Sequence, residues 1–308
     1  MKRHSLFQFL LINIALFFQS QVSAQEITLE KLWETDGFRN PESVVYDTKT
    51  EVLYVSNVNG AANEKDGNGF ISKVALDGKI LKKDWVTGLN APKGLAIHGN
   101  KLYTADIDTL VEIDIPTETI TNSYQVMDAK FLNDVAASMG GEVFVSDMMM
   151  NRIHQLKDGT FSIWLETPEL EAPNGLLVLD DYLIEGAWGV MVEGFKTDTP
   201  GHLKTISLKD KSIQSIGDGS PVGNLDGVET DLDGEYYVTD WMVGKLFHIK
   251  KSGEATELLT LEQGMADLEY IPEMDLIILP MMNTSKLLAY KAHEYEDDEA
   301  EEYEEEED

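Results

Sequence analysis

Six polar residues occupy the same position in six similar segments, and together they could bind a cation. They are Glu42, Lys93, Asn133, Asn174, Asp226 and Asp267, at successive steps of 51, 40, 41, 52 and 41 residues. Three carboxylates, two amides and one ammonium carry a net charge of −2, and burying them without a partner would be costly. A donor set rich in oxygen and free of His and Cys suits Ca²⁺, which takes about 6–8 oxygen ligands. The pattern predicts one calcium site where the six segments meet.

The same residues would supply the chemistry of a hydrolase. A bound calcium ion would polarise a substrate carbonyl and stabilise the developing oxyanion. Asp226 or Asp267 would activate water or attack the carbonyl, and the sequence leaves both roles open for either residue. Lys93 is the third candidate catalytic residue. It would either pair with Asp267 beside the ion or take the place of the ion, leaving a charge-neutral core without chemistry.

Each of these residues, taken alone, has a simpler explanation as a turn residue. Asn174-Gly175 and Asp226-Gly227 are common turn dipeptides, and Asn133 could cap a strand end. The position shared by all six segments is what favours a converged site.

A repeated unit of short strands must position these residues. Each segment has a short apolar strand, a turn rich in Gly, Asp, Asn or Pro, and a second strand of β-branched or aromatic residues, and two further strand-like runs follow it. The segments are 41–57, 92–106, 132–147, 173–186, 225–240 and 266–281. We predict an all-β fold, a six-bladed β-propeller with four antiparallel strands per blade, whose first strands line a central channel. A β-sandwich would not explain six copies in phase.

Segments outside the repeats complete the predicted fold. Residues 26–38 supply an extra strand, which we expect to close the ring by completing the last blade beside residues 286–291. Insertions at 59–69 and 191–202 are rich in Gly or in charged residues and are predicted to be loops.

Two further sets of side chains lie at or just after the ends of second strands. Asp147 and Asp240 end second strands, and we expect them to tie neighbouring blades through backbone N–H groups. Trp188, Trp241 and the run Met148–Met150 follow such strand ends near one mouth of the channel. They would either wall an apolar substrate pocket or pack at strand edges.

The composition excludes several classes of function. The chain has 308 residues and a formal charge of −32, and residues 25–293 hold 22 bases against 44 acids. A region this acidic is repelled by phosphate backbones, which excludes nucleic-acid binding. The absence of cysteine excludes disulfides, thiolate metal sites and Cys nucleophiles. No GxSxG, HExxH, P-loop or GxGxxG motif is present, so serine-hydrolase, zinc-peptidase and dinucleotide chemistry lose their main support.

Both ends of the chain differ from the repeats. Residues 1–24 combine a basic start, the apolar run Leu6–Phe18 and a cleavage site of small residues near Ala24, which is the layout of a secretory signal peptide. We therefore expect an exported protein, periplasmic or secreted, without a membrane span. Residues 294–308 hold twelve acids and no base and are predicted to form a disordered tail. The propeller would then span residues 25–293.

Four short motifs resemble those of the gluconolactonase/regucalcin family of six-bladed propellers, whose architecture paraoxonases and diisopropyl fluorophosphatase share. The motifs are PES with Glu42, LND with Asn133, PNG with Asn174 and LDG with Asp226, and the resemblance covers about residues 30–291. The resemblance implies that these four residues hold one Ca²⁺ in the channel. It also implies hydrolysis of lactones or related esters.

Two residues depart from the family pattern. Lys93 places an ammonium where the family usually has no cation, and Ser43 follows Glu42 where paraoxonases carry a second acid for a buried calcium. The family also includes propellers that bind ligands without known chemistry. Two hypotheses remain, of which we favour the first. One is a monomeric hydrolase of a small-molecule lactone or ester, and the other is a non-catalytic propeller that binds a small ligand or a protein at the channel mouth.

Overall fold

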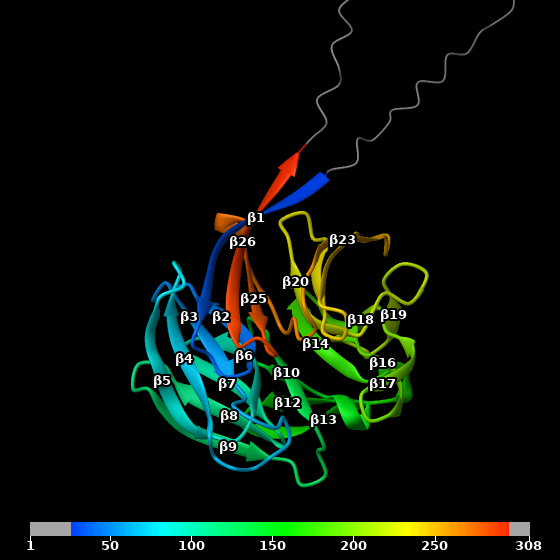
Figure 1. Cartoon of the computed structure of the whole chain (residues 1–308). Coiled ribbons are helices and arrows are strands. Elements are labelled where there is room, and N and C mark those ends of the chain that lie inside the picture. The colour runs from blue at the N-terminus through cyan, green and yellow to red at the C-terminus, as the bar shows by residue number, and fades with distance from the viewer. Residues whose placement is uncertain (1–25, 296–308) are drawn as a thin grey trace, which may run out of the picture. The chain divides into compact units, whose positions relative to one another are not determined.

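Six four-stranded antiparallel sheets follow one another around a ring, so the predicted six-bladed β-propeller is confirmed (Figure 1). The computed structural model describes residues 26–295. The predicted signal peptide and nearly all of the predicted acidic tail lie outside these described residues. Within residues 26–295, none of the helices has the length and apolar character needed to cross a membrane.

In the first five blades the strands pair in the order of the sequence, and the first strand of a blade is the innermost. The first blade holds β2 (Pro41–Asp47), β3 (Val52–Asn57), β4 (Gly69–Ala75) and β5 (Ile80–Leu89). The second holds β6 (Pro92–His98), β7 (Lys101–Asp106), β8 (Thr109–Asp114) and β9 (Thr119–Gln125). The third holds β10 (Leu132–Ala137), β11 (Val143–Asp147), β12 (Arg152–Lys157) and β13 (Thr160–Glu166).

The remaining blades follow the same plan with one insertion and one closure. The fourth holds β14 (Pro173–Leu179), β15 (Tyr182–Ala187), β18 (Leu203–Ser207) and β19 (Ile213–Ser215). The fifth holds β20 (Leu225–Thr230), β21 (Tyr236–Asp240), β22 (Lys245–Ile249) and β23 (Ala255–Thr260). The sixth joins β24 (Glu269–Ile271), β25 (Leu276–Met281) and β26 (Lys286–Tyr295) to β1 (Glu26–Asp36). The N-terminal strand therefore closes the ring, as predicted, and Figure 1 shows blue β1 beside red β26.

Neighbouring blades pack face to face and hold the core between them. Strands β3, β11 and β25 are buried at every position, because a neighbouring blade covers each of their faces. Between the first and second blades, Tyr54 and Ile71 pack with Leu95 and Leu102. Each large apolar side chain buried in this way contributes about 1.5–3 kcal/mol. Apolar packing between blades thus holds the channel strands in place.

Aspartates at the ends of second strands fix the linkers that enter the second, third and fifth blades. Asp147 accepts a hydrogen bond from the backbone N–H of Phe131 (3.1 Å), and Asp240 accepts one from that of Asn224 (3.1 Å). Asp106 does the same in the second blade. Because these linkers come from the preceding blade, the predicted tie between neighbouring blades is confirmed.

The two insertions differ in structure. The insertion at 59–69 has no strand before β4 begins at Gly69, as predicted for a loop. The predicted loop at 191–202 is wrong. In the fourth blade the inserted residues form a β-hairpin of β16 (Gly189–Glu193) and β17 (Lys196–Pro200). Glu193 pairs with Lys196, so only two residues connect the strands, and Gly194 supplies the positive φ (56°) that such a turn needs. The charged residues that suggested a loop lie on an exposed two-stranded ribbon.

The linker contacts predict a measurable loss of stability. Asp147→Ala should lower the free energy of unfolding by about 1–3 kcal/mol, because buried backbone N–H groups lose their acceptor. Urea unfolding measures this quantity. Asp84→Ala, at an exposed position of β5, is the control and should change it by less than about 0.5 kcal/mol. Equal effects of the two substitutions would contradict the structural role of Asp147.

Candidate functional site

A β-bulge in the inner strand of each of the first five blades takes two residues out of the regular ladder. In β2, Pro41 pairs with Asn57 and Val44 pairs with Val55, so two residues, of which Glu42 is the first, stand opposite one. The same shift occurs at the same place in β6, β10, β14 and β20. Bulges often occur beside functional sites because they re-aim side chains. Here the first bulge residue is in each case a predicted site residue.

The sixth blade places Asp267 one position later than predicted. The pairing of Met265 with Met281 sets the register of this blade. It puts Ala266, rather than Asp267, at the position that Glu42 occupies in the first blade. The predicted register is therefore wrong by one residue here, and Asp267 is not among the residues that line the cavity described next.

The other five predicted residues line one cavity of about 320 Å³ at a mouth of the channel. Its polar floor consists of Glu42, Lys93, Asn133, Asn174 and Asp226. Apolar side chains make up most of its wall, namely Ala62, Phe131, Met148, Trp188, Phe195, Trp241 and Met282. The bulges of five blades thus bring the predicted residues together beneath an apolar pocket.

A chain of hydrogen bonds links three of the floor residues. Asn133 Nδ2 donates to Asn174 Oδ1, and Asn174 Nδ2 donates to Asp226 Oδ1 (2.9 Å) and to the backbone oxygen of Leu225 (3.0 Å). The second residue of the bulge must be small here, because a Cβ on Gly175 would lie 1.9 Å from the backbone oxygen of Asp226. Close approach of neighbouring strands therefore fixes the two amides and the carboxylate relative to one another.

Two oxygens of the floor are buried without a hydrogen-bond partner among residues 26–295. They are Glu42 Oε2 and Asn133 Oδ1. Leaving a buried polar atom unsatisfied costs about 1–3 kcal/mol, and more when the atom is charged. A cation coordinated by both oxygens would remove this cost, and carboxylate and amide oxygens are ligands that Ca²⁺ prefers. The residues present therefore fit a hard divalent ion.

Burial and mutual repulsion keep the two floor carboxyls protonated to higher pH than usual. Burial, followed by the charge of Asp226, raises the pKa of Glu42 well above its ordinary value, although Lys93 opposes the shift. Burial, followed by the charge of Asp267, likewise raises the pKa of Asp226, against the hydrogen bond from Asn174. Burial therefore disfavours the charged form of both carboxyls, and the one floor lysine does not cancel this effect.

Lys93 is fully buried and is held by uncharged groups. Its Nζ donates to the backbone oxygen of Ala91 (3.0 Å) and lies over the ring of Phe131, 4.6 Å from the centroid. Burial lowers the pKa of Lys93 to about 8, against the charges of Glu42 and Asp106. Among the described residues Lys93 forms no ion pair, so the predicted pairing with Asp267 is wrong. The cause is the shifted register of the sixth blade.

The inserted hairpin contributes part of the pocket wall. Phe195 lies in the turn of this hairpin, and its backbone oxygen accepts a hydrogen bond from Trp188 Nε1 (2.9 Å). Its ring packs edge-on against Phe131 at a centroid distance of 5.3 Å. Trp188 and Trp241 line the pocket, which supports their predicted alternative as pocket walls, and Met148 is the one member of its methionine run that does so.

Sequence reasoning missed two of the aromatic residues in this wall. Phe131 directly precedes the LND motif, and Phe195 is a large apolar residue within a charged insertion. The position of Phe131 beside a site motif is a signal that could have found it. No local pattern identifies Phe195, because its role depends on a contact with a different blade.

A second cavity along the channel, of about 220 Å³, is lined by four carboxyl groups that are not in the first cavity. Its acidic lining residues are Asp134, Glu229, Asp267 and Glu269, and its lining includes no basic side chain. Asp267 accepts a hydrogen bond from Ser43 Oγ (2.6 Å), yet burial raises its pKa to about 7. Burial also raises the pKa of Glu269 to about 8. Asp267 therefore belongs to this second cavity.

Comparison with known proteins shows the fold but not the family. No family model matches the chain, and no curated protein matches it. A gluconolactonase from Xanthomonas campestris has 12% identity and a TM-score of 0.63, over 86% of this chain and 89% of its own. A protein of unknown function from Bacteroides thetaiotaomicron has 10% identity and a TM-score of 0.64, over 88% of this chain and 77% of its own.

A third similar structure is a lyase. It is a catalytically inactive variant of virginiamycin B lyase from Staphylococcus aureus, with one histidine replaced by alanine, in complex with quinupristin. It has 12% identity and a TM-score of 0.59, over 86% of this chain and 99% of its own. Proteins with this propeller fold therefore include enzymes of different reaction types.

The raised pKa of Asp267 predicts how stability changes with pH. Its folded-state pKa of about 7 exceeds the ordinary value of about 3.9. The carboxyl therefore favours folding at low pH, and this contribution is lost as the pH rises through about 7. Without metal, Asp267→Asn should thus be more stable than the wild type near neutral pH, but not near pH ~4.

Chemical denaturation of both proteins across this pH range tests the expectation. Asp84→Asn, at an exposed carboxylate of β5, is the control and should leave the pH profile unchanged. A profile for Asp267→Asn that runs parallel to that of the wild type would show that the carboxyl titrates alike in both states.

Proposed function

We propose that the chain is an exported, calcium-dependent hydrolase of lactones or related esters. One observation carries this proposal: Glu42 Oε2 and Asn133 Oδ1 are buried without partners at the floor of an apolar pocket. The likeness of the floor residues to gluconolactonase motifs supports it, as does the presence of a gluconolactonase among structures with this fold.

Four floor residues would hold the calcium ion through oxygen atoms. They are Glu42, Asn133, Asn174 and Asp226. Two carboxylates match the charge of a divalent ion. Hydrogen bonds fix the orientation of the two amide side chains within the floor. When bound, the ion would polarise a substrate carbonyl and stabilise the oxyanion that develops on it.

Asp226 is the better placed of the two candidate bases. Its Oδ1 accepts a hydrogen bond from Asn174, which orients the carboxylate, while its side chain lines the pocket. It would take a proton from the water that attacks the carbonyl carbon. Asp267 lines the second cavity and accepts a hydrogen bond from Ser43, so we assign it no contact with substrate.

Lys93 would serve as the acid for the departing oxygen. A pKa of about 8 lets the ammonium give up its proton near neutral pH more readily than an exposed lysine does. The backbone oxygen of Ala91 and the ring of Phe131 hold Nζ at the floor of the pocket. The proton on Nζ would pass to the alkoxide when the ester bond breaks.

The pocket wall indicates an apolar substrate. The rings of Phe131, Trp188, Phe195 and Trp241 bound the space above the floor. Such a wall would bind an aryl or alkyl group and exclude bulk water from the reacting carbonyl. We therefore propose a lactone or ester with an apolar substituent.

A lyase reaction receives less support. The structurally similar lyase is inactive when one histidine is replaced by alanine. In the channel pocket of this chain, no histidine is among the lining residues. The floor instead offers carboxylates, amides and one lysine, which suit hydrolysis at a metal-bound carbonyl.

A substrate screen tests the proposal directly. We expect turnover of lactones or aryl esters in calcium, loss of turnover on chelation and recovery when calcium returns. Compounds with apolar substituents should react faster than sugar lactones because of the aromatic wall. Calcium binding without turnover of any compound would favour the non-catalytic propeller, and turnover that survives chelation would contradict the role of the metal.

Removing a ligand charge should weaken calcium binding. Glu42→Gln and Asp226→Asn each keep the shape of the side chain and remove one negative charge, so each should lower calcium affinity by about tenfold or more, or ~1.4 kcal/mol. Calorimetric titration measures the affinity, with Asp84→Asn as a surface control. Unchanged affinity in both floor variants would show that the ion does not bind there.

Replacing Lys93 separates its two possible roles. Lys93→Met keeps the apolar stem and removes the charge, so as the proposed acid it should lower turnover by about 10²–10⁴-fold and alter the pH profile. The variant should still bind calcium. A Lys93→Met protein that gains calcium affinity and loses no turnover would instead mean that the ammonium substitutes for the ion in the wild type.

A further inference from the structure

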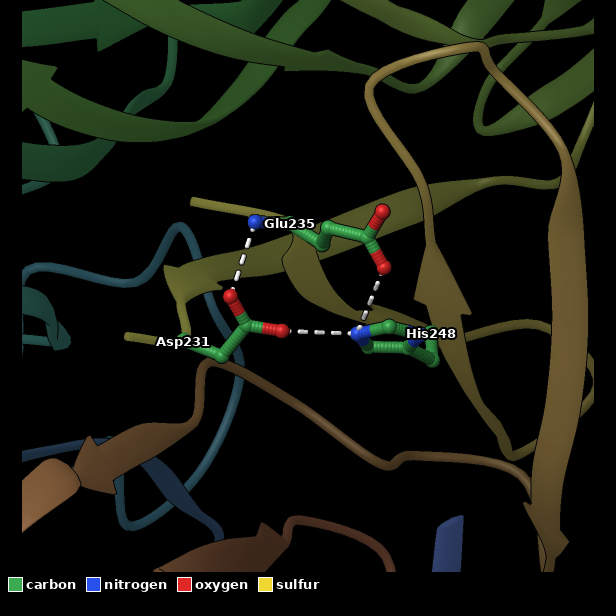
Figure 2. Close-up of side chains that lie close together, drawn as sticks. All are labelled: Asp231, Glu235 and His248. Carbon is green, nitrogen blue, oxygen red and sulfur yellow. Dashed lines mark hydrogen bonds and ion pairs between the residues drawn. The ribbon is translucent and has the colours of Figure 1, made fainter. Parts of the chain in front are cut away.

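A group of metal-ligating side chains lies in the fifth blade, away from the channel pocket (Figure 2). Asp231 follows the end of β20, Glu235 precedes β21, and His248 lies on β22. One ligand atom from each residue lies within 4.8 Å of the others. Five residues of extended chain, about 16 Å, separate Asp231 from the floor residue Asp226. The group is therefore distinct from the proposed catalytic site.

Hydrogen bonding holds one of the three residues rigidly. Asp231 Oδ1 accepts from the backbone N–H groups of Asp233 (2.9 Å) and Glu235 (2.8 Å), which fixes the turn between β20 and β21. Its second oxygen, Oδ2, lies 2.8 Å from His248 Nε2. Only 7% of Asp231 and 8% of His248 are exposed. A buried oxygen and a buried ring nitrogen are thus held in place.

A hydrogen bond between Asp231 and His248 does not account for the third residue, Glu235. Glu235 Oε2 also points at His248 Nε2, from 3.7 Å (Figure 2). One ring nitrogen carries at most one proton, and 3.7 Å is too long for a hydrogen bond. Lys250 of this blade pairs with Glu254, and Lys251 donates to the backbone oxygen of Asp233. Neither lysine neutralises the two carboxylates that converge on His248.

We propose that Asp231, Glu235 and His248 bind one zinc ion. Ligand atoms about 2.0–2.1 Å from a tetrahedral zinc lie roughly 3.3 Å from one another. The two observed separations, 2.8 Å and 3.7 Å, lie on either side of this value. The Glu235 side chain, 27% exposed, is free to close the difference. One imidazole and two carboxylates are a zinc donor set, whereas calcium needs more oxygens than the group offers.

The zinc ion would act as a clip within the blade. It joins the β20–β21 turn to β22, next to the ring of Tyr237, which lies 5.2 Å from the imidazole. Since a metal that binds only the folded state stabilises it, the ion should raise the unfolding temperature. A tetrahedral zinc ion with three protein ligands would have a fourth coordination position open to water.

Zinc titration of the full chain tests the site. Calcium at about 1 mM occupies the weak oxygen sites of this acidic protein, and zinc is then added in a calorimeter. We expect one saturable zinc site and a higher unfolding temperature. Cobalt in place of zinc should give the intense visible absorption of a tetrahedral site.

Two variants and a matched control identify the ligands. His248→Gln keeps a donor to Asp231 but removes the imidazole. Glu235→Gln changes a side chain whose carboxylate lies 3.7 Å from His248 Nε2, which is too far for a hydrogen bond. Each should lower zinc affinity by about tenfold or more and reduce the thermal shift. His202→Gln is the control, because among the described residues only one carboxylate, that of Glu171 at 3.9 Å, lies within 4.0 Å of a His202 ring nitrogen, and His202 bonds Ser215. It should change zinc affinity by less than about twofold.

The outcomes separate a metal site from a structural hydrogen bond. If the wild type shows no saturable zinc binding in the presence of calcium, the proposal is wrong. Asp231 and His248 then form only a histidine–aspartate hydrogen bond. Zinc binding that survives in Glu235→Gln and in His248→Gln would place the ion elsewhere and overturn the proposal. If His248→Gln fails to fold, Glu235→Gln decides alone, because its fold does not depend on the altered group.

Discussion

Carboxylates that outnumber the nearby cations are the constraint on which the rest of the channel depends. Glu42 and Asp226 face one cavity and Asp267 faces the other, and Lys93 is the single basic residue among the lining of both. Burial therefore raises the pKa of each of these carboxyls. The apolar packing between blades must offset this cost, as is common where a fold carries a functional site. A bound cation is the simplest way to relieve it.

The repeats were sufficient to predict the architecture and five polar residues that line one cavity. In the first five blades a polar residue follows the first paired residue of the inner strand, and a bulge turns that polar residue into the channel. The periodic sequence thus encodes the register as well as the fold, because a misplaced bulge would bury charge between blades. Glu42, Asn133 and Asp226 could be placed from their spacing alone.

The sixth blade and the pocket wall could not be placed in the same way. Asp267 has the residue type and spacing of a floor residue, but β24 is only three residues long. The bridge between Met265 and Met281 places Asp267 one position beyond that of the floor residues. Phe195 depends on a tertiary contact with Phe131 of another blade. Strand periodicity carries no information about either, since both depend on where separate segments meet.

The two proposed metal sites lie at opposite ends of one strand and differ in their donors. The channel floor offers only oxygen atoms at the start of β20, whereas His248 adds a nitrogen beside the turn that follows it. Calcium prefers many oxygens and zinc prefers few ligands that include imidazole, so donor chemistry would sort the two ions. A clip at the far end would also restrain β20, on which Asp226 lies. Order at the zinc end would thereby help to hold a calcium ligand in position.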